Sequence, residues 1–149
     1  MSPPAEPEGP REPVDPKRRW RWALGGFLAL LAVILALAWT GSLPTRQLAR
    51  IPYYDTIMHF ALIGGAGLLT HRALGRRHAA LGPLRVPLGP SIVLGLAAGE
   101  ELLQIGSLVR TFSLSDLAAD VCGVVGLYLL DRWWAARRGG EVTSAGPRG

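Results

Sequence analysis

An uncharged apolar run from Ala23 to Trp39 constrains this chain more than any other feature of its sequence. An α-helix rises about 1.5 Å per residue, so this run and its flanking tryptophans reach the ~30 Å thickness of a hydrocarbon core. Only 18% of the 149 residues are charged, whereas an average soluble domain has roughly 25%. The sequence therefore predicts a membrane protein rather than a soluble domain.

Three further helices are expected at about 55–70, 86–109 and 116–134, and each carries polar residues in an apolar background. A charge at mid-membrane costs a few kcal/mol, so such helices are stable only where their polar positions face one another inside a bundle. The predicted fold class is an all-α integral membrane bundle of four transmembrane helices. All three segments are rich in small residues that permit close packing, namely Gly64, Gly65, Gly67, Gly95, Gly99, Gly123 and Gly126.

The basic residues indicate how this bundle lies in the membrane, because cytoplasmic segments beside the spans carry an excess of Lys and Arg. With the N-terminus inside, only Arg46, Arg50 and Arg110 fall on the outer side. Both termini are therefore predicted to be cytoplasmic, and the arginine clusters need no nucleic-acid partner to explain them. The inner-side segments hold the other basic residues, including Lys17, Arg18, Arg19, Arg21, Arg72, Arg76, Arg77, Arg85, Arg132, Arg137, Arg138 and Arg148.

The chain is expected to form one domain between two disordered tails. Residues 1–19 are rich in Pro and Glu, residues 20–134 hold the four helices, and residues 135–149 form a basic tail. The pattern Ala36-Leu37-Ala38 resembles a signal-peptidase site, so retention or cleavage of the first helix stays open. Cleavage would leave the orientation of the other three helices unchanged.

Acidic and imidazole side chains recur near the outer ends of two of these helices. Asp55 and His59 are four positions apart, and Asp116 and Asp120 repeat that spacing. Residues i and i+4 share one face of a helix. Because both helices run inward from the outer surface, we expect the two pairs to lie at the same depth.

The helix between them brings further polar residues to that depth. It runs outward with Glu100, Glu101 and Gln104 on one arc of its surface, and Arg110 caps its outer end. Glu101 is placed about 12 Å below that end. Three separate helices thus deliver polar side chains to one leaflet, which predicts a polar pocket that opens outward.

Several kinds of chemistry are available in the predicted pocket. The Arg110 guanidinium presents a planar fork of donors that suits phosphate or carboxylate. His59 exchanges protons near neutral pH, and His59 and Glu101 are the candidate general bases of any reaction. The other predicted binding residues are Asp55, Gln104, Asp116 and Asp120.

No cofactor is predicted for this pocket. The carboxylates could hold a hard divalent cation, but helix spacing alone gives no diagnostic set of metal ligands, so no metal is predicted. The sequence also lacks a Gly-rich phosphate loop, an HExxH motif and a Gly-x-Ser-x-Gly elbow.

Several of these residues also have purely structural interpretations. Asp116 could be the N-cap of its helix together with a neighbouring serine. Arg110 could pair with an acid at the interface. Glu101 could serve only to hold helices together. His71 and His78 fall in the basic inner loop and are expected to be solvated.

The order of these residues resembles the VanZ-like family of small bacterial membrane proteins, over about residues 52–128. The resemblance implies a multi-helix protein of the bacterial cytoplasmic (inner) membrane whose motif residues face the extracytoplasmic side. The namesake branch of the family is associated with resistance to a glycopeptide antibiotic. The matching motifs are Asp55-x-x-x-His59-Phe60, Glu101-Leu-Leu-Gln104, Arg110, and Asp116-Leu-Ala-Ala-Asp120-x-x-Gly123-x-x-Gly126.

Two positions depart from the family pattern. The first motif usually has Lys directly after its Asp, where this chain has Thr56, and the last usually has Asn where this chain has Asp120. Both departures make the predicted pocket more acidic. They weaken an interpretation based on anion binding alone and favour the involvement of a proton or a cation.

The leading functional hypothesis is recognition of a phosphorylated envelope lipid or lipid-linked glycan precursor, for cell-envelope function or glycopeptide resistance. Whether the chain also modifies this ligand stays open, so the chain is not assigned as an enzyme. One alternative is a small proton- or cation-coupled carrier, which would act as a homo-oligomer because four such helices enclose little lumen. The other alternative is a non-catalytic membrane scaffold.

Overall fold

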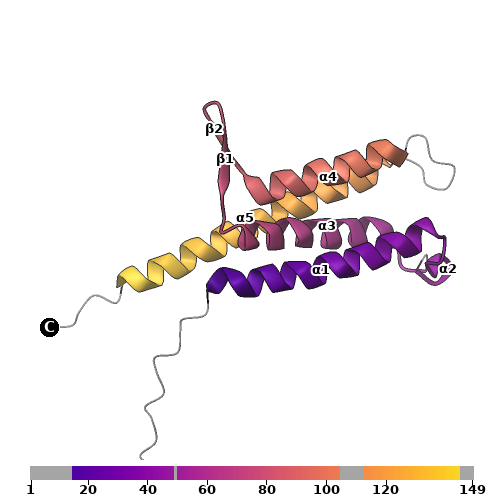
Figure 1. Cartoon of the computed structure of the whole chain (residues 1–149), viewed down its shortest axis with the longest axis horizontal. Coiled ribbons are helices and arrows are strands. Elements are labelled where there is room, and N and C mark those ends of the chain that lie inside the picture. The colour runs from indigo at the N-terminus through magenta and orange to yellow at the C-terminus, as the bar shows by residue number, and fades with distance from the viewer. Residues whose placement is uncertain (1–14, 49, 105–112, 145–149) are drawn as a thin grey trace, which may run out of the picture.

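The computed structural model describes residues 15–48, 50–104 and 113–144, and they form a mostly helical structure with one small two-stranded sheet (Figure 1). The outer end of the bundle is defined here as the end that holds α2 and the first turns of α3 and α5. The inner end is the one that holds the sheet. The elements are α1 (Pro16–Trp39), α2 (Thr45–Leu48), α3 (Tyr54–Ala73), β1 (His78–Leu81), β2 (Leu84–Pro87), α4 (Leu88–Gln104) and α5 (Leu114–Ser144).

Helix α1 has a well-defined start. Asp15 is its N-cap and accepts a hydrogen bond from the Lys17 backbone N–H at 3.0 Å, and Pro16 occupies the first turn, where its missing N–H costs nothing. Residues 16–19 are predicted from the sequence to lie in a disordered tail. They are helical instead, because the Asp-Pro pair forms a helix start.

In the described part of the chain, one segment, Lys17–Trp39, is long and apolar enough to cross a membrane by length and composition. A signal sequence near an N-terminus has the same properties. The other long helices do not meet that criterion, since α3 and α5 carry more polar residues and α4 is described only as far as Gln104. Four membrane spans therefore remain a prediction from the sequence.

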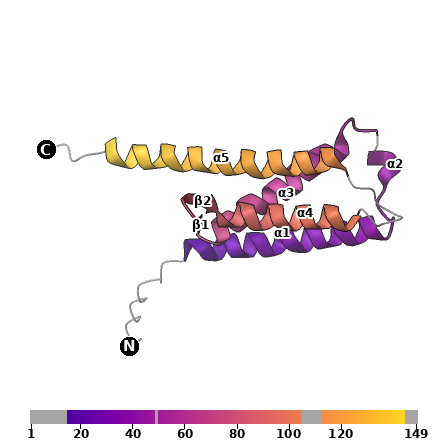
Figure 2. The same ribbon diagram turned by 90° about the horizontal axis from the view of Figure 1, so that it is seen from above.

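Helix α3 lies at the centre of the structure and packs against α5, α4 and α1, most extensively against α5. Figures 1 and 2 show the four long helices side by side along one axis, with α5 extending past the inner ends of α1 and α3. A polar residue on α3 can therefore meet polar residues from each of the other long helices.

Glycines permit the close approach of α3 and α5. A Cβ added to Gly64 would lie 2.7 Å from the backbone of Gly123, and one added to Gly123 would overlap the carbonyl oxygen of Phe60. Helix α4 differs, because nothing described lies within 4 Å of a Cβ at Gly95 or Gly99. The predicted packing role therefore applies to α3 and α5, whereas the GxxxG pattern of α4 faces away from the described residues.

The inner loop contains a β-hairpin that the sequence analysis did not predict. Strands β1 and β2 pair antiparallel, with His78 opposite Pro87 and Leu81 opposite Leu84. Gly82 adopts φ +60° in the turn between them. The third helix consequently begins at Leu88 rather than near Val86.

The ends of the other helices also differ from the sequence analysis. Helix α5 continues to Ser144, although a disordered tail was expected from residue 135. Alanines and arginines after Trp134 favour helix, so the helix does not stop at the expected membrane boundary.

Polar side chains occupy the interior of this structure, and large apolar ones cover its surface. His71, Glu101, Asp120 and Val124 are the largest fully buried side chains, each at most 2% exposed. Leucines, isoleucines and tryptophans on all four long helices are exposed. Soluble proteins show the opposite distribution, with large apolar side chains inside and charged ones at the surface.

Candidate functional site

A cluster of four polar side chains lies at the outer end of the bundle, and we call it the outer cluster. It consists of His59 from α3, Glu101 from α4, and Asp116 and Asp120 from α5. His59 Nδ1 lies 3.1 Å from Asp120 Oδ1, and His59 Nε2 lies 4.0 Å from Asp116 Oδ2. The imidazole therefore sits between two carboxylates that are one helical turn apart.

Close backbone packing sets the distance between His59 and Asp120. Gly123 follows Asp120 by one turn, and its Cα faces the backbone of Phe60, the residue after His59. Any side chain at position 123 would push α5 away from α3. Gly123 is thus the reason that an imidazole on one helix reaches a carboxylate on the other.

Ser113 arranges the start of α5. Its hydroxyl oxygen accepts a hydrogen bond from the Asp116 N–H at 3.3 Å, and its carbonyl accepts one from the Leu117 N–H at 3.2 Å. These bonds are those of an N-cap residue. The suggestion that Asp116 caps the helix is therefore wrong, and its carboxylate faces His59 instead.

Glu101 joins α4 to this helix start. Its carboxylate is 2% exposed, and Oε2 accepts a hydrogen bond from the Ser113 backbone N–H at 3.2 Å. A buried carboxylate is costly unless it is hydrogen-bonded or paired. Ser113 therefore links the Glu101 carboxylate of α4 to the first turn of α5, because its N–H binds Glu101 and its hydroxyl caps the Asp116 backbone N–H.

Three members of the outer cluster could hold a cation. His59, Glu101 and Asp116 each offer one ligand atom, and these atoms lie within 4.8 Å of one another. Asp120 on the other imidazole nitrogen is the kind of partner that orients a metal-ligating histidine. Metal–ligand bonds of about 2.0–2.2 Å place neighbouring ligand atoms roughly 3.3 Å apart, so binding would require the cluster to contract.

An apolar cavity of about 230 Å³ adjoins the outer cluster. Aliphatic side chains of α1 and α3 form its walls, and residues between α1 and α3 close it. Asp55, His59 and Glu100 provide its polar end. The apolar lining includes Leu31, Ile34, Leu35, Leu43, Leu48, Met58, Leu62 and Ile63.

The predicted site residues divide into three groups. His59, Glu101, Asp116 and Asp120 come together as described, and Asp55 lies beside His59 in the wall of the cavity. Gln104 is the last residue of α4, and its side chain is outside the description. Arg110 lies outside the described residues. The three-helix convergence inferred from sequence depth is thus present in the structure.

A second polar cluster, at the inner end, was missed by the sequence analysis. Asp131 of α5 is 2% exposed and accepts hydrogen bonds from Arg72 and Arg76, with N–O distances from 2.5 to 3.0 Å. These bonds raise the pKa of Arg76 above its ordinary value. Both arginines were treated only as topological anchors. The signal that could have revealed the cluster is Asp131 itself, an isolated acid near the end of an apolar helix.

The two inner-loop histidines also differ from expectation. His71 is only 2% exposed, and its ring packs edge-on against Tyr128 with centroids 5.1 Å apart. His78 is exposed, and its Nε2 lies 3.2 Å from the Tyr128 hydroxyl. The prediction that His71 is solvated was wrong because α3 continues to Ala73, which places His71 on the helix and against Tyr128 of α5.

Comparison of the chain with protein-family models, with curated proteins and with solved structures finds no match. Membership of the VanZ-like family therefore stays a prediction that rests on the order and spacing of the motifs.

Proposed function

We propose that this chain is a multi-pass membrane protein whose outer cluster faces away from the cytoplasm. Support comes from the reversed distribution of side chains, with Glu101, Asp120 and Asp131 buried inside and large apolar residues outside. Hydrocarbon favours that arrangement, because intramembrane acids face the interior of a bundle. The excess of basic residues at the inner end supports the orientation.

We further propose that the outer cluster and the adjoining cavity bind a phosphorylated envelope lipid or lipid-linked glycan precursor. The observation that carries this proposal is the apolar cavity with a polar end at Asp55, His59 and Glu100. An amphiphile fits such a site, because its chain replaces water along the aliphatic walls while its head group meets the polar side chains.

Each residue then has a role in binding. Asp120 fixes the orientation of the His59 imidazole through the 3.1 Å contact at Nδ1, which leaves Nε2 directed toward Asp116 and the head group. Glu101 supports the start of α5 through Ser113. Arg110 follows α4 in the sequence and is the proposed donor to phosphate.

A carrier of protons or cations is the second candidate function. The observation that favours it is the close grouping of His59, Glu101 and Asp116, whose ligand atoms lie within 4.8 Å of one another. Carboxylates and histidines inside membranes mark ion pathways and proton relays. In reconstituted vesicles, Glu101→Gln would abolish uptake driven by a pH gradient if this candidate is correct.

The cavity is tested by filling it. Ile34→Trp places a larger side chain in the wall, whereas Val33→Trp makes the same kind of change at an exposed neighbour that does not line the cavity. The measurement is equilibrium binding of farnesyl phosphate to the full chain in detergent. We expect Ile34→Trp to lower affinity about tenfold, since excluding two methylene groups at about 0.8 kcal/mol each has that effect.

Val33→Trp should change farnesyl phosphate affinity less than twofold, and equal losses in both variants would refute the cavity assignment.

The polar end is tested by comparing farnesyl phosphate with farnesol. His59→Ala should weaken binding of the phosphate and leave binding of farnesol unchanged. Parallel weakening of both ligands would mean that the outer cluster does not contact the head group.

A further inference from the structure

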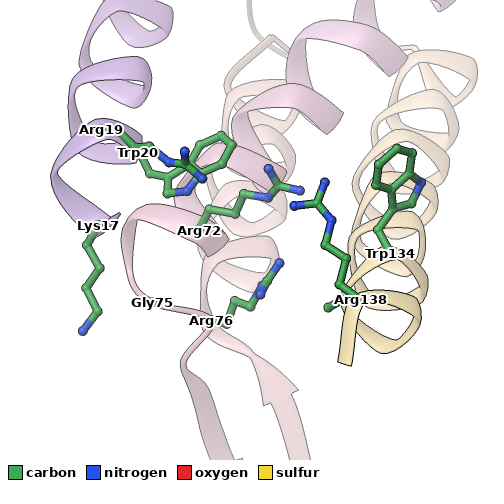
Figure 3. Close-up of a pocket in the computed structure, with 9 residues that line it drawn as sticks. Lys17, Arg19, Trp20, Arg72, Gly75, Arg76, Trp134 and Arg138 are labelled. Atoms are coloured by element: carbon green, nitrogen blue, oxygen red, sulfur yellow. The ribbon is translucent and has the colours of Figure 1, made fainter. Parts of the chain in front are cut away.

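A basic pocket at the inner end of the bundle is separate from the outer cluster. It has a volume of about 400 Å³ and lies between the first turns of α1, the end of α3 and the last turns of α5 (Figure 3). Five cationic side chains line it, Lys17, Arg19, Arg72, Arg76 and Arg138. Sites for small ligands have volumes of about 300–1,000 Å³, so the pocket can accommodate more than an ion.

Tryptophans hold several of these guanidinium groups by their flat faces. Arg72 lies 4.3 Å and Arg19 lies 5.1 Å from the centre of the Trp20 ring, and Arg138 lies 5.4 Å from the Trp134 ring. Figure 3 shows Arg72 and Arg138 projecting into the space between α1 and α5. A guanidinium held by its face can direct its in-plane N–H donors at an anion, and this applies to Arg19 and Arg138, since Arg72 already donates to Asp131.

Positive charge in the pocket exceeds the negative charge available to balance it. Among the described residues, Asp131 is the carboxylate that pairs with the pocket cations, and Arg72 and Arg76 share it. Lys17, Arg19 and Arg138 lie around the same hollow. Like charges around one space repel each other, so a bound anion stabilises this arrangement.

We propose that the basic pocket binds a phosphate group, supplied by the head group of an anionic phospholipid. Phosphate matches the guanidinium forks, and Trp20 and Trp134 are the residue type that lies at head-group level in a membrane interface. Anionic lipids attract basic segments on the cytoplasmic side. The lipid source rests on the membrane orientation proposed above, whereas the phosphate chemistry depends only on the pocket.

The test compares two double variants with the same change in net charge. Arg19→Gln with Arg138→Gln removes two cations that line the pocket. Arg18→Gln with Arg137→Gln removes their sequence neighbours, which do not line it, although Arg137 also stacks on a tryptophan, 3.8 Å from the Trp133 ring. The measurement is binding of dioctanoyl phosphatidylglycerol to the full chain in detergent, with helix content followed by circular dichroism.

We expect the pocket pair to lower affinity roughly 10- to 30-fold, and the neighbouring pair less than threefold. Equal losses in the two pairs would overturn the proposal, because they would reflect net charge alone. If the pocket pair loses helix content, Arg19→Lys with Arg138→Lys replaces it. This variant keeps the charge but lacks the planar forks, and it should still lose affinity relative to wild type.

Inorganic pyrophosphate separates the two sources of phosphate. We expect it to compete with phosphatidylglycerol only weakly, since it gains nothing from the apolar surroundings. Tight pyrophosphate binding without phosphatidylglycerol binding would overturn the lipid source. Ile34→Trp, which tests the outer cavity, should leave phosphatidylglycerol binding unchanged, so the two proposals can fail separately.

Discussion

The two ends of the α3–α5 pair each hold a buried aspartate from α5, but in opposite electrostatic surroundings. At the inner end, Asp131 accepts hydrogen bonds from Arg72 and Arg76, and both of its oxygens are engaged. At the outer end, Asp120 shares one imidazole with Asp116. The inner arrangement is a closed ion-pair network. Among the described residues, the outer cluster instead has more hydrogen-bond acceptors than donors.

This difference bears on function, because a closed set of hydrogen bonds has nothing to offer a ligand. Asp131 is fully used by its arginines, so the anion-binding capacity of the inner end comes from the cations around it. The outer cluster places the carboxylates of Asp116 and Asp120 against His59, and His59 also lines the adjoining cavity. The two ends should therefore respond differently when a single aspartate is made neutral.

The largest loss of stability is expected for Asp131→Asn. An amide removes the negative charge that balances Arg72 and Arg76 and replaces one acceptor oxygen with an NH2 donor that faces a guanidinium. Breaking a fully buried pair costs about 3–5 kcal/mol, and the partial exposure of Arg72 and Arg76 reduces this to about 2–3 kcal/mol. Thermal unfolding in detergent measures the change. Arg132→Gln, at the next position, should lower the free energy of unfolding far less. An equal loss there would show that the ion pairs of Asp131 are not what stabilises this end.

Gly123→Ala tests the packing that brings the outer cluster together. The added methyl group would collide with the Phe60 carbonyl, so α3 and α5 must separate. Overpacking of this kind costs about 1–3 kcal/mol. Gly126→Ala is the matched control, because its nearest neighbour would lie at 3.9 Å. A lowered unfolding temperature is expected for the first variant only, together with weaker farnesyl phosphate binding.

Ser113→Ala removes the cap of α5, and a loss of about 1 kcal/mol is expected. The change leaves the backbone N–H of Ser113 in place for Glu101, so it separates the cap from the contact between helices. Ser115→Ala is the control, since the Ser115 hydroxyl contacts only Ser113 among the described residues. If both variants lose the same stability, the hydroxyl pair rather than the cap is what matters.

The sequence was informative where a pattern repeats along one helix. The spacings of Asp55 with His59 and of Asp116 with Asp120 fix a shared face, and helix direction fixes a shared depth. Together with the position of Glu101 in the helix between them, these two facts predict that polar residues of three helices lie at one depth. They could not show that Ser113, rather than Asp116, is the N-cap of α5, because the N-cap depends on the exact residue at which the helix starts.

Other features depend on contacts between distant positions. The Asp131 cluster joins residues more than fifty positions apart, and the positive-inside pattern offered a sufficient explanation of Arg72 and Arg76 without it. The β-hairpin is short and has little alternation of polar and apolar residues, so periodicity did not predict it. The burial of His71 follows from the end of α3, which continues past the predicted residue 70 and packs His71 against Tyr128 of α5.

Asp120→Asn should have the smallest effect on stability, and it provides the direct counterpart of Asp131→Asn. The Asn carbonyl can still accept a hydrogen bond from His59 Nδ1, so the 3.1 Å contact survives in neutral form and the expected cost is below about 1 kcal/mol. Thermal unfolding of the two variants side by side gives the comparison. A cost as large as that of Asp131→Asn would mean that the outer aspartate is also locked in an ion pair. The outer cluster would then be a scaffold that holds α3 and α5 together, as Asp131 does at the inner end.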